Sequence, residues 1–314
     1  MKPEDLNIVA LAGGVGGARL ADGLAQVLQP QQLTVIVNIG DDFTYIGLRI
    51  SPDLDTVCYT LAGLSNPVTG WGRSNDTWRV LENLREMGVP GWFQIGDADL
   101  ATHLIRSFRL QQGDRLSQIT RDFCHAWGVQ VNVLPMSDDI IQTWVYTDEG
   151  DLEFQEYFVH RQSKPKVKGF WFEGVEKARP AEGILEAIDR CDAVVICPSN
   201  PWVSIDPIFS IPDLKQAIGG HLVIAISPII GDQTVKGPAA KMFNELGIQP
   251  SALAVAQHYS RTINFLVIDK GDDSLVDDIN KLGIQTYPTD ILMHDRPDRG
   301  RLAQELLDII KVNR

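Results

Sequence analysis

The stretch LAGGVGGARL (residues 11–20) places four glycines between an apolar run and the first turns of a helix. The apolar run LNIVALAGG (6–14) is typical of a buried strand, and ARLADGLAQVL (18–28) has apolar residues at helical spacing. A second strand-like run, LTVIVNIG (33–40), follows. This order predicts parallel strands joined by a right-handed crossover, and therefore an α/β, Rossmann-like, doubly wound fold with a mostly parallel sheet.

The same pattern returns in the second half of the chain. Strand-like runs cover residues 192–201, 221–230 and 265–270. The segment 238–247 between them is typical of a helix, and 300–312 is typical of a closing helix. Both halves are therefore expected to contribute strands to one sheet.

The middle of the chain has a different pattern. Three helices are predicted first, over residues 77–88, 98–110 and 115–128. The runs VQVNVLPM (129–136), IIQTWVYTDEGDLEFQEYFVHR (140–161) and VKGFWFEGV (167–175) then alternate as antiparallel strands do. The chain is therefore expected to form a single Rossmann-like domain over residues 1–314, with an inserted subdomain at about 130–180.

Composition excludes several classes of partner. The formal net charge is −13, and nucleic-acid and membrane surfaces both need a basic face. No stretch approaches the roughly 18 apolar residues of a membrane-spanning helix, and none reads as a signal peptide. The four cysteines show no CxxC pairing, which favours a reduced, cytoplasmic protein.

The glycine loop fails two common nucleotide-binding patterns. Gly14 and Gly16 fit the dinucleotide fingerprint G-x-G-x-x-G, but Arg19 occupies its third position, where close packing needs glycine. Asn38 replaces the acidic residue expected at the end of the second strand, and the loop lacks the Walker lysine. Two interpretations remain: a turn that binds an anion at a helix N-terminus, or a tight turn without a ligand.

Four carboxylates follow the second strand. Asp41 and Asp42 come at its end, and Asp53 and Asp55 lie in the first turn of a helix that begins near Pro52. Helix capping alone would account for Asp53, explains Asp55 less well, and does not explain Asp41 and Asp42. Mg²⁺ binds through one or two carboxylates together with substrate phosphates. We therefore expect a Mg²⁺ site built from these four aspartates.

Nine motifs, in order along the chain, make a specific resemblance. They are GGVGGARL, IVNIGDD, SPDLDT, GWGRSNDTW, IGDADLATHLIRS, LPMSDD, PSNPWVSIDPI, SPIIG and KGPAAKM. Together they resemble the 2-phospho-L-lactate transferase family of coenzyme F-420 biosynthesis, and the match covers roughly residues 7–295. GGVGGARL, GWGRSNDTW and DPI look more like the bacterial branch of that family than the archaeal one.

The resemblance implies a Mg²⁺-dependent, homodimeric transferase with a Rossmann-like core. The implied donor is a guanosine diphosphate ester of lactate, or of enolpyruvate in bacterial relatives. The implied acceptor is 7,8-didemethyl-8-hydroxy-5-deazariboflavin. Its terminal ribityl hydroxyl attacks the phosphorus next to the three-carbon acid, GMP leaves, and a phosphodiester forms.

The resemblance also implies contacts to the deazaflavin. The aspartate that matches Asp55 contacts it in the family, so Asp55 and Asp42 are the candidate catalytic residues, as proton acceptor or Mg²⁺ ligand. A second family contact is a basic residue, and Gln94 stands at that position here, which leaves at most a hydrogen bond. Asn75 and Arg106 lie in matching motifs and are candidate substrate contacts.

The candidate donor contacts are the loop glycines, the cation after them and polar residues at two strand ends: Gly13, Gly14, Gly16, Gly17, Arg19, Asn38, Ser199 and Asn200. The glycines would present N–H groups to the diphosphate or guanosine side of the donor. The polar strand-end residues would hydrogen-bond guanine or ribose. Arg19 fits a phosphate contact and a structural ion pair equally well.

Two further polar groups favour structural interpretations. His103 lies three residues before Arg106, so the two share a helix face, and His103 is expected to be a satisfied helix histidine. The run SDD (137–139) fits an exposed turn slightly better than a second metal site.

An alternative function belongs to a different class of protein. A non-catalytic regulator that binds a nucleotide or nucleotide sugar can share the same core and glycine loop. SPDLDT followed by GWGRSNDTW and IGDADLATHLIRS is not expected in such a regulator. Their presence therefore favours the enzyme.

Overall fold

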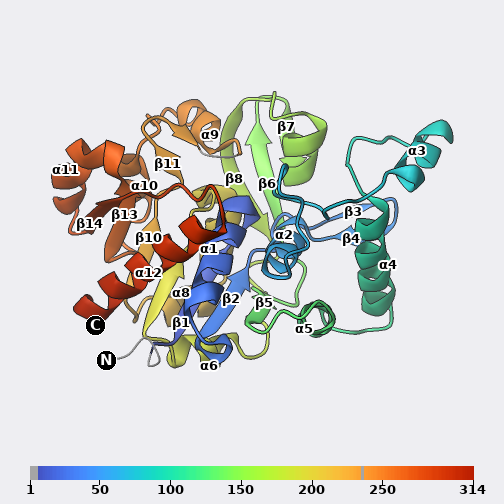
Figure 1. Cartoon of the computed structure of the whole chain (residues 1–314). Coiled ribbons are helices and arrows are strands. Elements are labelled where there is room, and N and C mark those ends of the chain that lie inside the picture. Colours follow the sequence, from blue (N-terminus) through green and yellow to red (C-terminus); the bar gives the residue numbers. More distant parts are fainter. Residues whose placement is uncertain (1–5, 235–236) are drawn as a thin grey trace.

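A seven-stranded parallel sheet forms the centre of the molecule (Figure 1). The computed structural model describes residues 6–234 and 237–314, so residues 1–5 and Lys236 of the KGPAAKM motif lie outside it. The strands, in their order across the sheet, are β14 (Gln285–Thr289), β13 (Phe265–Asp269), β10 (Val223–Ile226), β9 (Ala193–Ile196), β1 (Ile8–Ala12), β2 (Leu33–Val37) and β5 (Asn132–Pro135). All six neighbouring pairs are parallel, which confirms the predicted fold class.

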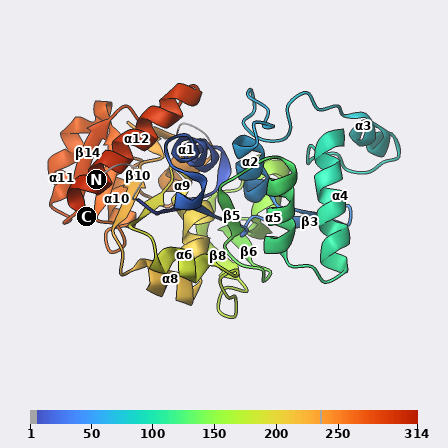
Figure 2. The ribbon, with the colours of Figure 1, turned by 60° about the horizontal axis from the view of Figure 1, so that its bottom comes forward.

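Helices cover both faces of the sheet, which explains why its central strands are apolar on both sides. Every residue of β1, β9 and β10 is buried. Figure 2 shows helices on opposite sides of the strands. On one side α1 packs against α2 and α12, and on the other lie α6 and α8: α1 (Gly14–Val27), α2 (Pro52–Leu61), α12 (Arg296–Asn313), α6 (Ile184–Asp189) and α8 (Pro212–Ile218).

The strand order reverses between β1 and β9. After β1 the chain builds outward through β2 and β5, and after β9 it builds in the other direction through β10, β13 and β14. The glycine loop follows β1, and the PSNP turn (198–201) follows β9. Both loops therefore flank the crevice in which doubly wound proteins bind ligands.

One arm of the molecule extends away from the sheet and has a small apolar core of its own. Figure 1 shows it beside α2, with a hairpin and helices toward its outer end. The core contains Phe43, Tyr45, Ile50 and Ile95. The elements of this part are β3 (Phe43–Tyr45), β4 (Leu48–Ile50), α3 (Arg79–Glu86), α4 (Asp97–Gln111) and α5 (Leu116–Ala126), the last of which leads back to β5.

The antiparallel region is smaller than expected. A three-stranded sheet has the order β7-β6-β8, with β6 (Gln142–Thr147), β7 (Gly150–Glu153) and β8 (Val167–Glu173). The prediction that residues 129–136 join it is wrong, because β5 pairs in parallel with β2 and lies buried at the end of the main sheet. The predicted strand after β7 instead forms a π-helical turn, η3 (Glu156–His160), which places Gln155 and Tyr157 in the interior.

The remaining elements are short. They are η2 (Pro30–Gln32), η4 (Pro201–Ile205), α7 (Asp206–Phe209), β11 (Ile229–Ile230), β12 (Gln233–Thr234), α9 (Ala239–Glu245), α10 (Ala252–His258), η5 (Lys270–Leu275) and α11 (Val276–Asn280). β14 was not predicted, because it is partly exposed and Pro288 interrupts its pattern, as is usual on an edge strand. Within the described ranges, no helix combines the length and apolarity needed to cross a membrane.

Candidate active site

A cavity of about 720 Å³ opens at the switch point. Its wall includes the glycine loop, the start of α2 and the PSNP turn, so it lies where the sheet topology predicts. The arm contributes residues 92–94 and two residues of α4, and the antiparallel region contributes residues 154–162. The cavity is therefore assembled from the parallel core and from both additions to it.

The glycine loop uses two of its N–H groups within the protein. The Gly13 N–H donates to Ser199 Oγ at 3.2 Å, and the Gly14 N–H donates to Asp53 Oδ1 at 2.6 Å. The prediction that these two groups face a diphosphate is therefore corrected. Val15 and Gly16 follow in the first turn of α1, where N–H groups have no acceptor within the helix. In the described chain these two N–H groups have no other acceptor. They are the loop donors left free for an anion.

Close packing accounts for the other half of the glycine pattern. A Cβ on Gly16 would lie 2.2 Å from the carbonyl oxygen of Pro198, and one on Gly17 would lie 2.8 Å from Ser199 Oγ. Gly14 has φ +63°, a conformation that favours glycine. The loop therefore needs glycine to dock on the PSNP turn as well as to approach a ligand.

The variant Gly16→Ala is expected to destabilise the protein by about 1–3 kcal/mol, because the added methyl overlaps a backbone carbonyl that a side-chain rotation cannot move. Chemical denaturation of the purified variant measures this loss. Gly220→Ala is the matched control, since a Cβ there meets open space. Equal denaturation midpoints for the two variants would show that the loop can shift to accommodate the methyl group without a loss in the free energy of unfolding.

Asp41 and Asp53 both line the cavity, and both carboxyls are buried. Asp53 accepts from Gly14 and, through Oδ2, from Asn38 Nδ2 at 3.0 Å, while burial raises its pKa to about 6. Burial and the nearby charge of Asp53 raise the pKa of Asp41 well above its usual range. Asp41 Oδ1 is buried and has no hydrogen-bond partner among the described residues. A hard cation fits this pair, because it would compensate both charges and supply the missing partner.

Asp42 and Asp55 are instead held by arginines. Asp42 Oδ2 accepts from Ser51 Oγ at 2.6 Å and lies 3.4 Å from Arg49 Nη2, and burial raises its pKa to about 6. Asp42 is absent from the cavity wall. In the described chain, no three acidic, histidine or cysteine side chains form a metal-binding group. The expected four-aspartate site is thus reduced to Asp41 and Asp53.

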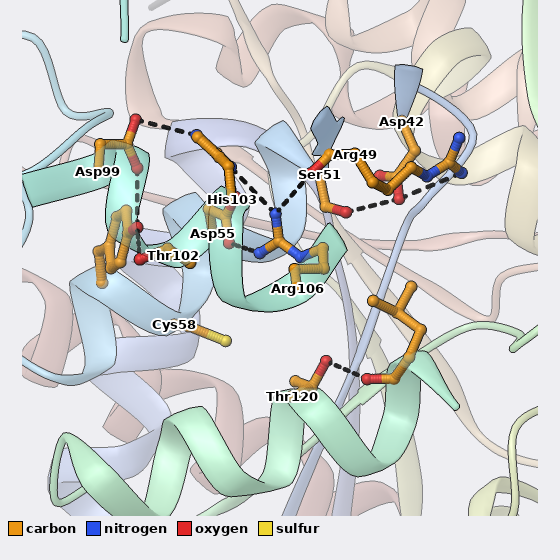
Figure 3. A network of polar contacts seen from close by, with 12 residues as sticks. Asp42, Arg49, Ser51, Asp55, Cys58, Asp99, Thr102, His103, Arg106 and Thr120 are labelled. Atoms are coloured by element: carbon orange, nitrogen blue, oxygen red, sulfur yellow. Dashed lines mark hydrogen bonds and ion pairs between the residues drawn. The ribbon is translucent and has the colours of Figure 1, made fainter. Parts of the chain in front are cut away.

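Asp55 belongs to a buried charge network whose members Tyr59, Asp99 and His103 also line the cavity (Figure 3). Its Oδ1 pairs with Arg106, and its Oδ2 lies 3.7 Å from His103 Nδ1. His103 Nε2 lies 3.3 Å from Asp99 Oδ2, and Asp99 Oδ1 accepts from the Tyr59 hydroxyl at 2.7 Å. Burial raises the pKa of Asp55, and the charge of Arg106 opposes that shift. His103 and Arg106 contact each other at 3.2 Å, as their spacing predicts.

Three predicted substrate contacts prove to be structural. Arg106 is 1% exposed, Asn38 is wholly buried, and neither lines the cavity. Arg106 instead pairs with Asp55, and Asn38 donates a hydrogen bond to Asp53. Asn75 is exposed, has φ +54°, and lies in a turn outside the cavity wall. Its neighbour Asp76 accepts from the N–H groups of Ala98 and Asp99. Asp76 of the GWGRSNDTW motif therefore holds the start of α4, whereas Trp71 and Gly72 of the same motif line the cavity.

The SDD run is a structural turn. Asp138 accepts from the N–H and hydroxyl of Ser117 at the start of α5, at 2.7 and 2.8 Å. Asp139 accepts from the Arg179 N–H at 2.9 Å. Neither aspartate lines the cavity.

Arg19 faces the cavity without a carboxylate partner. Its Nη1 donates to the Met293 carbonyl at 3.2 Å, and no ion pair to it is found in the part of the chain that the structure describes. The structural ion pair considered for Arg19 is therefore not observed. It is the one lysine or arginine among the described wall residues, so it is available to an anionic ligand.

The predicted residues at the ends of β9 and in the arm do reach the cavity. Ser199, Asn200 and Gln94 all lie in its wall. The Ser199 hydroxyl also donates to the Gly13 carbonyl at 2.9 Å, and Asn200 Oδ1 accepts from the Trp202 N–H at 3.1 Å.

An aromatic wall was not predicted. Trp92, Phe93, Phe154 and Phe158 line the cavity. Phe154 and Phe158 stack with centroids 5.4 Å apart, and the Trp92 ring stacks on His160 at 5.0 Å. The sequence signal was present as WF at 92–93 and as an i, i+4 phenylalanine pair, which the expected strand would have placed on one exposed face.

A parallel sheet with a free helix terminus, an acidic pair and the Arg19 guanidinium at its switch point defines a Rossmann-like protein whose cavity suits an anionic ligand. Residues 8–311 match the family model described as 2-phospho-L-lactate transferase CofD. The chain belongs to this family and is a transferase.

Similar proteins carry two names. The chain is 41% identical over 312 residues to the phosphoenolpyruvate transferase of Streptomyces griseus, covering 97% of this chain and 98% of that protein. It is 38% identical over 297 residues to the 2-phospho-L-lactate transferase of Methanosarcina acetivorans, covering 95% and 97%. The solved structure of protein BH3568 from Bacillus halodurans shares the fold, with a TM-score of 0.64 at 16% sequence identity. The superposition covers 97% of this chain and 100% of that one.

Proposed function

We propose that the protein transfers a phospholactyl or phosphoenolpyruvyl group from a guanosine diphosphate ester to the ribityl hydroxyl of 7,8-didemethyl-8-hydroxy-5-deazariboflavin, releasing GMP. One observation carries the proposal. A single cavity joins free anion donors and an acidic pair to an aromatic wall and a buried aspartate. The names of the similar transferases support the class of group that is moved.

The donor would lie along the start of α1. The free N–H groups of Val15 and Gly16 in the cavity wall would bind its diphosphate, and Arg19 lies about one turn further along the same helix. Ser199 and Asn200, across the switch point, would hydrogen-bond the guanosine. We assign the diphosphate to the start of α1 because it combines free N–H groups with the Arg19 charge, whereas the start of α2 carries Asp53 and Asp55.

Asp41 and Asp53 would hold Mg²⁺ in this arrangement. The unpartnered Asp41 Oδ1 and the mutual repulsion of the two carboxyls fit a divalent cation. When bound, the ion supplies charge compensation for the diphosphate. Asp42 has no such role, since it lies outside the cavity wall.

The acceptor would lie against the aromatic wall. Flat rings stack on aromatic side chains, and Gln94 offers one hydrogen bond where the family has a cation. Asp55 lines the same cavity, and among the described residues its buried Oδ2 has no hydrogen-bond partner. The ribityl oxygen would form the new bond to phosphorus while its proton passes to Asp55 Oδ2. The phosphorus–oxygen bond to GMP breaks, and its electron pair leaves with GMP.

Turnover of the purified protein tests the proposal. We expect GMP release and a deazaflavin phosphodiester with at least one of the lactyl and enolpyruvyl esters in Mg²⁺, and no turnover in excess chelator. Full activity in chelator would remove the metal from the proposal. Nucleotide binding without turnover of either ester would favour the regulatory alternative. The homodimer and the cytoplasmic location stay predictions.

A further inference from the structure

We propose that Gln155 is a positioning residue that orients Asp41 and thereby sets the affinity of the site for a divalent cation. The inference rests on the metal site of the proposed function. It concerns a side chain that neither the motifs nor the comparisons single out. Gln155 lies between β7 and η3, in the antiparallel region, yet it is buried and lines the cavity.

The contact between the two side chains is asymmetric. Gln155 Nε2 donates to Asp41 Oδ2 at 3.2 Å, whereas Asp41 Oδ1 has no partner and is buried. A carboxylate with one oxygen held by a buried donor cannot rotate freely, so its other oxygen keeps one direction. Outer-shell donors of this kind fix the orientation of metal ligands. Gln155 therefore selects Oδ1 as the oxygen offered to the cation.

A second contact from the antiparallel region holds the backbone beside Asp41. The Thr143 N–H at the start of β6 donates to the Gly40 carbonyl at 2.6 Å. The turn that carries Gln155 is anchored in turn by the Phe154–Phe158 stack. The antiparallel region thus fixes Asp41 through both its main chain and its side chain.

The chemistry of the donor distinguishes Asp41 from its neighbours. Asp42 and Asp55 are paired with Arg49 and Arg106, whose charges compete with a cation. A glutamine amide donates a hydrogen bond but carries no charge. It therefore orients Asp41 while leaving the negative charge available to the metal.

The test compares Gln155→Met with the wild type. Methionine keeps much of the volume and removes the donor, and Gln142→Met in β6 is the matched control because Gln142 lies outside the cavity wall. Mn²⁺ binding is measured by electron paramagnetic resonance without substrates. We expect Gln155→Met to bind Mn²⁺ about 10- to 100-fold more weakly. The Gln142→Met control should bind as the wild type does.

A second measurement separates positioning from a general structural role. The Mg²⁺ concentration for half-maximal turnover should rise in Gln155→Met by a similar factor, and turnover at saturating Mg²⁺ should return close to the wild-type rate. Wild-type Mn²⁺ affinity in Gln155→Met would overturn the inference alone. Loss of turnover that added Mg²⁺ does not restore would also overturn it. Absence of Mn²⁺ binding in the wild type would overturn both this inference and the metal site.

Discussion

Replacing Arg106 with methionine is expected to destabilise the protein by about 3–5 kcal/mol, because Asp55 would keep a buried charge without its partner. Arg106 is 1% exposed and pairs with Asp55; Asp55 lines the cavity, whereas Arg106 does not. Chemical denaturation at neutral pH, with unchanged m-value, measures the loss. Turnover should fall as well, since Arg106 holds Asp55 in place.

Arg109→Met is the control for this prediction. Arg109 lies on the same helix and pairs with Asp114 and Asp122 at 2.6 Å each, but Asp122 is more than half exposed at 54%. Exposed pairs of this kind contribute only up to about 1 kcal/mol. If the two arginine variants lost the same free energy of unfolding, the special role of the buried pair would be wrong.

The core of the fold was predictable because its signals are local. β1, β2, β9, β10 and β13 each read as short apolar runs, since helices bury both faces of the sheet. β5 and η3 could not be assigned the same way. The pattern of an apolar run does not indicate which sheet the strand joins, and no local sequence pattern predicts a π-helical turn.

The sequence predicted where the candidate site lies better than it predicted the role of each residue in it. The glycines marked the switch point correctly, yet a glycine pattern reports that a Cβ is excluded and not what excludes it. At Gly16 the excluding group is the Pro198 carbonyl. Likewise, four aspartates in two motifs look alike in sequence. Their partners come from distant segments, such as Arg106 for Asp55 and Gln155 for Asp41.

Those partners divide the aspartates into two kinds. Asp42 and Asp55 carry charges that arginines already compensate. Asp41 and Asp53 lie close to each other, and among the described residues their hydrogen-bond partners are neutral: Gln155, Asn38, Ser204 and the Gly14 N–H. A site with uncompensated charge is poorly stable by itself and gains most from a ligand that supplies the opposite charge.

The variant Asp41→Asn is therefore expected to change stability and activity in opposite directions. In chelator at pH 8 it should be more stable than the wild type by about 1 kcal/mol or more, because a buried Asp41 carboxyl must either carry a desolvated charge or retain a proton that the unfolded chain releases, and a neutral amide does neither. With Mg²⁺ and both substrates, its turnover should fall at least about a hundredfold, since metal charge compensation contributes several kcal/mol and about 1.4 kcal/mol corresponds to tenfold.

The stability advantage of Asp41→Asn over the wild type should depend on pH. Burial and Asp53 raise the pKa of Asp41 in the folded protein, so above about pH 4 the unfolded chain releases a proton that the folded chain retains. Wild-type stability is lost as the pH rises through that range, and the asparagine variant avoids this loss. Its advantage should grow from pH 4 toward pH 8 and vanish in acid. Denaturation curves across this range measure it, with the surface variant Asp278→Asn as control. A variant that lost stability at pH 8 and kept its turnover would show that Asp41 is a structural residue, and would move the metal away from this pair.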